Sequence, residues 1–123
     1  MPKSDVELAA IEYAKKRLRQ LTGEEPTEMP EGCGYDLRCG ERCIEVKGTR
    51  GPTPGFCFFT DGTFRAAQKE QSLELWLVTE ALDNATLYVI SREELLRTMK
   101  LEVQWVLPLG KKRLEGYRRP DSA

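Results

Sequence analysis

The chain has 123 residues, of which 40% are hydrophobic and 32% charged, and its net charge is −1. This length suits one domain with one modest core, and the near-neutral charge provides no global positive field for recruiting nucleic acid. No apolar signal region opens the chain, and no apolar run approaches the roughly 20 residues that span a bilayer. We therefore expect a cytoplasmic protein without a membrane partner.

The chain contains no histidine, which excludes Ser–His and Cys–His nucleophiles, histidine general bases and histidine-ligated metal sites. Its four cysteines, Cys33, Cys39, Cys43 and Cys57, form no CxxC pair. Zinc sites normally carry two such tight pairs. We therefore interpret the cysteines as reduced thiols that pack as small hydrophobic side chains, with a structural zinc site as the weaker alternative.

The N-terminal half begins with a predicted helix. Ser4 and Asp5 can cap this helix, which runs to about Leu21 and stops at Gly23. In chain order, the pattern then predicts a loop over 24–34, a strand over 35–39, a turn at Gly40 and Glu41, a strand over 42–47, a flexible loop over 48–55 and a short apolar strand over 56–60.

The sequence of the C-terminal half predicts a helix, two strands, a further helix and a last strand. In chain order, these are a helix from Asp61 or Thr63 to about Gln71, apolar strands over 73–82 and 85–91 around a turn at Asp83 and Asn84, a helix from Ser91 to about Lys100 and a strand over 101–107. Residues 1–107 are expected to form a single domain and residues 108–123 a basic tail. The whole order predicts an α/β fold with a central mixed sheet flanked by helices.

Two acids and a lysine stand out in the predicted hairpin. Strand alternation places Glu45 and Lys47 on one side, about 7 Å apart along the strand, and Ile44 and Val46 on the other. If Asp36 on the neighbouring strand shares the first side, two carboxylates converge, and two hard oxygen ligands suit Mg²⁺. The alternative is an ordinary half-exposed hairpin in which Glu45 and Lys47 form an ion pair in solvent.

The first helix offers one more acid. Its helical spacing predicts a buried face consisting of Glu7, Ile11, Ala14, Leu18 and Leu21. An acid on such a face is unfavourable unless it is paired or binds a ligand, so Glu7 is the helix residue that we expect at the site. Alternatively, Glu7 is a first-turn acid that the helix dipole and solvent tolerate.

These segments resemble a known family. "VELAAIEYAKKRL", "GYDL", "CIEVKGT", "FCFFTDGTFRAA" and "TLYVIS" occur in the order found in the PD-(D/E)xK nuclease superfamily. The chain looks closest to the Mrr-like branch and to the domain at the C-terminus of the plant protein NO VEIN. The resemblance implies a restriction-endonuclease-like αβββαβ core.

The same resemblance implies roles for individual residues. Asp36 matches the first motif acid, Glu45 and Lys47 match the ExK half-motif, and Glu7 matches the helix acid. Asp36 and Glu45 would then bind Mg²⁺ or Mn²⁺, while Lys47 assists the attacking water. One departure is Thr63, which stands where many relatives carry an acid.

The leading hypothesis is therefore a Mg²⁺-dependent nuclease that hydrolyses DNA phosphodiester bonds and acts as a homodimer to cut both strands. The alternatives are a catalytically inactive nucleic-acid-binding or protein-interaction module on the same fold, and an unrelated metal-free interaction protein. The candidate nucleic-acid contacts are Arg38, Arg50, Lys111 and Lys112. Basic clusters of this kind can equally be solvated surface.

Overall fold

The protein is described by a computed structural model that covers residues 3–102, 107–108 and 110–119. Its elements, in chain order, are α1 (Asp5–Thr22), β1 (Thr27–Glu28), β2 (Leu37–Cys39), β3 (Arg42–Gly48), α2 (Asp61–Lys69), β4 (Leu73–Thr79), β5 (Thr86–Ser91), α3 (Arg92–Thr98) and α4 (Lys111–Glu115). The strands form one sheet in the order β1-β2-β3-β4-β5. Strands β3 and β4 are parallel, and the other neighbouring pairs are antiparallel. This mixed sheet with flanking helices confirms the predicted restriction-endonuclease-like α/β fold class.

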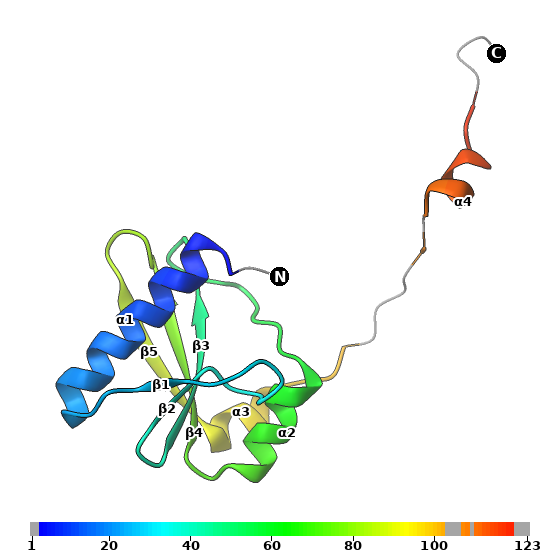
Figure 1. Cartoon of the computed structure of the whole chain (residues 1–123). Helices are drawn as coiled ribbons and strands as arrows, with labels where there is room; N and C mark the ends of the chain where they lie inside the picture. The colour runs from blue at the N-terminus through cyan, green and yellow to red at the C-terminus, as the bar shows by residue number, and fades with distance from the viewer. Residues whose placement is uncertain (1–2, 103–106, 109, 120–123) are drawn as a thin grey trace.

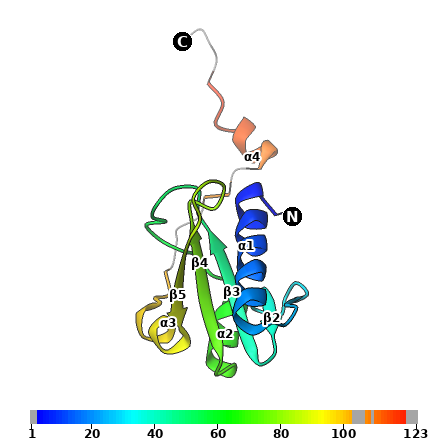
Figure 2. The ribbon, with the colours of Figure 1, turned by 90° about the vertical axis from the view of Figure 1, so that its left-hand side faces the viewer.

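The sheet is covered on both faces, as Figures 1 and 2 show. Helix α1 packs on one face, where Ile44, Val46 and Trp76 belong to a shared hydrophobic cluster. Helices α2 and α3 cover the other face, where Cys43 and Leu75 lie in a second cluster. The two sides of β3 therefore both face packed side chains, as expected of a strand in the middle of an α/β sheet.

Helix α1 begins and ends as predicted. The Ser4 hydroxyl accepts a hydrogen bond from the Glu7 N–H, and Gly23 ends the helix with φ of 73°, in the left-handed region that glycine adopts readily. The predicted buried face is too long, however, because the buried residues of α1 extend only from Ala10 to Leu18. Leu21 is 58% exposed, and Glu7 is also exposed.

One predicted strand is wrong and one strand was missed. Residues 56–60 form no strand, because both neighbours of β3 in the sheet are already present as β2 and β4. Strand β1, inside the predicted loop over 24–34, pairs with β2 instead and supplies the third strand before α2. Of the predicted strand over 101–107, residues 103–106 lie outside the described residues, and Leu101 and Glu102 are not in a strand.

The C-terminal elements are short. Ser91 caps α3 by accepting the Glu94 N–H at 3.2 Å, as the sequence predicts. Helix α4 is exposed throughout and is drawn apart from the α/β body in Figures 1 and 2. None of the helices within the described part of the chain has both the length and the apolar character needed to cross a membrane.

Candidate functional site

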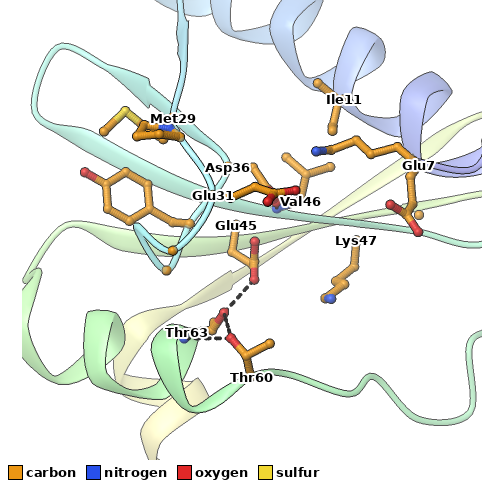
Figure 3. A pocket seen from close by; sticks show the side chains of 16 residues that line it. Glu7, Ile11, Met29, Glu31, Asp36, Glu45, Val46, Lys47, Thr60 and Thr63 are labelled. Carbon is orange, nitrogen blue, oxygen red and sulfur yellow. Dashed lines mark hydrogen bonds between the residues drawn. The ribbon is translucent and has the colours of Figure 1, made fainter. Parts of the chain in front are cut away.

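The predicted acid–acid–lysine set lies in one pocket of about 350 Å³ beside the C-terminal half of β3. Asp36, Glu45 and Lys47 line it, together with Glu7 from the first turn of α1. Figure 3 shows Glu45 and Lys47 pointing from β3 toward the start of α2, with Glu7 near the Lys47 end. The structure therefore brings together all four residues that the sequence singles out as catalytic candidates.

Asp36 is fixed by the backbone of the neighbouring strand. It comes immediately before β2, and its N–H donates to the Ile44 carbonyl at 2.9 Å. One of its carboxylate oxygens, Oδ2, accepts the Val46 N–H at 2.7 Å. This contact between side chain and backbone holds the Asp36 carboxylate against β3, next to Glu45.

Glu45 is buried, with 7% of its surface exposed. Its Oε2 accepts a hydrogen bond of 2.9 Å from the hydroxyl of Thr63, in the first turn of α2. This burial contradicts the alternative of an ordinary half-exposed hairpin, in which Glu45 would face solvent. The reason is the helical layer: α2 covers the side of β3 that a bare hairpin would leave open.

The environment of Glu45 disfavours its charged form. Burial, and then the nearby Asp36 carboxylate, raise the pKa of Glu45 to about 8, although the Thr63 hydrogen bond and the charge of Lys47 oppose the rise. A carboxyl group with this pKa keeps its proton at neutral pH unless another positive charge replaces it. Carboxyl groups with a strongly shifted pKa are frequent in functional sites.

Lys47 is the cation that β3 contributes to the pocket. Its side chain is half-buried, and its ammonium lies 5.3 Å from the centroid of the Phe59 ring, within cation–π range. Phe59 precedes α2, so the segment between β3 and α2 folds back over Lys47. This contact restrains a long side chain that would otherwise move freely.

Glu7 is at the site for a different reason from the one predicted. It is exposed in the first turn of α1, so the argument from an acid buried on a helix face does not hold. It nevertheless lines the pocket, because the N-terminus of α1 projects beyond the buried part of the helix toward the end of β3.

The predicted nucleic-acid contacts do not line this pocket. Arg50 is exposed and forms an ion pair of 3.3 Å with Asp5 at the start of α1. Arg38 is exposed on β2 and donates to the Tyr35 hydroxyl at 3.3 Å. Lys111 and Lys112 belong to α4. Their role in binding nucleic acid stays a prediction.

The pocket suits a hard divalent cation. Asp36 and Glu45 offer carboxylate oxygens, of which Asp36 Oδ2 accepts the Val46 N–H and Glu45 Oε2 accepts the Thr63 hydroxyl. Among the described residues, no group of three or more His, Cys, Asp or Glu side chains is close enough to hold a metal ion. Two protein carboxylates completed by water and phosphate are nonetheless the usual donor set for Mg²⁺.

Thr63 and Glu31 are among the pocket residues that were not predicted as part of the site. Thr63 departs from the family pattern, yet its hydroxyl donates a hydrogen bond directly to Glu45. Glu31, in the loop before β2, also lines the pocket. The Thr60-x-x-Thr63 spacing could have identified a helix start, but only the packing of α2 on β3 reveals the contact with Glu45.

In comparison with known protein families, residues 6–106 match the family described as "Protein NO VEIN, C-terminal". The matched region includes the whole pocket except Lys3. The chain matches no curated protein and no solved structure.

Proposed function

The chain belongs to the NO VEIN C-terminal family, and on that premise we propose that it is a Mg²⁺- or Mn²⁺-dependent nuclease that hydrolyses DNA phosphodiester bonds. The observation that carries this proposal is the position of Glu45. Its buried carboxyl lies beside the Asp36 carboxylate, in a pocket that also contains Lys47. Placing a buried carboxyl beside a second acid is costly unless a proton or a cation compensates for the charge.

Each residue then has a role in hydrolysis, in which a water oxygen bonds to phosphorus and the bond to the sugar oxygen breaks. A divalent cation, when bound, would lower the pKa of water and neutralise charge on the phosphate. Asp36 and Glu45 would hold the cation through their carboxylate oxygens. Lys47 would stabilise negative charge that develops on the phosphate oxygens. Glu7, at the open end, would orient water.

A binding module without catalysis is the second candidate. It is favoured by the protein hydrogen bonds that Asp36 and Glu45 already make, because these give both acids a structural role. The two candidates differ in one property: a module would bind nucleic acid without a cleavage step that depends on Lys47.

The test incubates the protein with plasmid and oligonucleotide DNA in Mg²⁺, Mn²⁺ or EDTA. We expect cleavage only with a metal, and its loss in Asp36→Asn and Lys47→Ala. Matched controls are Asp83→Asn, in the loop before β5, and Lys69→Ala, at the end of α2, which should cleave normally. Metal-dependent binding without cleavage would favour the module. Cleavage that survives in Lys47→Ala would remove this site from the mechanism.

A further inference from the structure

All four phenylalanines of the chain lie between positions 56 and 64. Three of them are exposed: Phe56 by 79%, Phe58 by 68% and Phe64 by 42%. We call these three the aromatic wall. Burying a Phe side chain stabilises a fold, and three exposed rings on one short segment do not contribute this stabilisation. Such concentrations of exposed apolar surface commonly mark binding sites.

Phe56 and Phe58 of the aromatic wall belong to a segment whose half-buried side chains face the candidate site. Along it, exposed Phe56 and Phe58 alternate with half-buried Cys57 and Phe59. The Phe59 ring contacts Lys47, and the Lys47 charge opposes the rise that burial causes in the Cys57 pKa.

The segment continues directly into the residues that hold Glu45. Thr60 caps α2 and lines the pocket, and Thr63 bonds to Glu45. Figure 3 shows Thr60 and Thr63 next to the Glu45 carboxylate. The segment that carries Phe56 and Phe58 therefore borders the pocket at Lys47 and Glu45.

The composition of the segment bears on the class of ligand that the wall suits. Between 56 and 64 the only apolar side chains are Phe and Cys, without any aliphatic residue, and the exposed cation Arg65 follows Phe64 directly. Flat aromatic rings with an adjacent cation are how proteins hold successive bases of a single strand.

We propose that the aromatic wall stacks on unpaired nucleobases, so that the site takes single-stranded nucleic acid or the single-stranded end of a duplex. The inference rests on the proposed function, because it assumes that a phosphate enters the pocket. Base faces in a duplex are covered by their neighbours, so only unpaired bases offer a face to Phe56 or Phe58.

The test measures binding by fluorescence anisotropy in EDTA, where metal-dependent cleavage does not occur. The probes are a labelled oligothymidylate and a labelled hairpin duplex. We expect the single strand to bind more tightly than the duplex. Phe56→Ala and Phe58→Ala should each weaken single-strand binding about tenfold, because stacking contributes roughly 1–3 kcal/mol per base. Phe56→Tyr should retain it.

Phe58→Leu separates stacking from general apolar contact, and we expect it to bind as weakly as Phe58→Ala. Tyr117→Ala, which removes an exposed ring beyond α4, is the matched control and should bind normally. Wild-type binding by Phe58→Leu, or equal binding of single strand and duplex, would overturn the inference. So would self-association that depends on Phe56, since the occupant would then be a second copy of the chain.

This assay separates the two proposals. Absence of cleavage in Mg²⁺ refutes the nuclease without affecting the anisotropy result. Cleavage that proceeds while the phenylalanine variants bind normally refutes only the stacking surface.

Discussion

Glu45 makes the stability of the protein depend on pH. Its pKa in the folded state is about 8, against 4.5 for the free side chain, so the folded form binds more protons between these values. The stabilisation is therefore complete below about pH 4.5 and is lost as pH rises through 8. Each pKa unit corresponds to about 1.4 kcal/mol, so the loss should reach a few kcal/mol.

Glu45→Gln should flatten this dependence. Urea unfolding in EDTA at a series of pH values would show a smaller fall in the unfolding free energy than in the wild type. The exposed Glu93→Gln is the control and should leave the slope unchanged. An unchanged slope in Glu45→Gln would mean that Glu45 titrates near its ordinary pKa.

Thr63 offers a second prediction. Thr63→Val keeps the shape of the side chain but leaves Glu45 Oε2 without its buried donor, so unfolding should become easier by about 1–3 kcal/mol. The pKa of Glu45 should also rise further, because the Thr63 hydrogen bond lowers it. Thr63→Ser, which restores a hydroxyl, should recover both properties. Chemical denaturation measures the free energy of unfolding, and an NMR titration of the Glu45 carboxyl carbon measures its pKa. Failure of Thr63→Ser to recover both values would contradict the prediction.

The contact between α1 and β3 depends on Gly48, the last residue of β3. A Cβ at this position would lie 2.7 Å from the Ala10 Cβ and 3.1 Å from the Val6 carbonyl oxygen. Gly48→Ala should therefore push α1 away and destabilise the fold by roughly 1–3 kcal/mol. Because Glu7 and Lys47 come from these two elements, the proposed DNA cleavage should fall as well. Gly51→Ala, where a Cβ meets nothing within 4 Å, is the control for thermal melting and cleavage assays.

The sequence predicted helix ends and strand faces correctly where the residues of one segment are sufficient to determine its structure. The Ser4 cap, the Gly23 stop and the alternation along β3 all follow from local rules. The predicted strand over 56–60 failed because strand formation needs a free neighbour, and β3 has none. Conversely, β1 contains only Thr27 and Glu28, too few residues to give a pattern, and exists because β2 offers an open edge.

The pocket itself results from the connection between β3 and β4. These strands are parallel, so the chain must cross over the sheet, and the crossover carries α2. Helix α2 covers the side of β3 that carries Glu45 and Lys47, so these side chains lie in a pocket instead of on an open hairpin. The motif residues were predictable because two of them share one strand face. The burial of Glu45 and its bond to Thr63 were not, because they depend on how a distant helix packs.

A bound cation should stabilise the whole molecule. A ligand that binds only the folded state adds a free energy that grows with its concentration, about 2.7 kcal/mol at one hundred times its Kd. We expect Mg²⁺ or Mn²⁺ to raise the melting temperature and EDTA to reverse the effect. The rise should be larger at pH 8 than at pH 6, because the cation competes with the proton on Glu45. Calorimetric melting of the wild type and an Asp36→Asn/Glu45→Gln double variant measures it. An equal rise in both proteins would place the cation elsewhere, since the double variant keeps the side-chain volumes and replaces both carboxyl groups with amides.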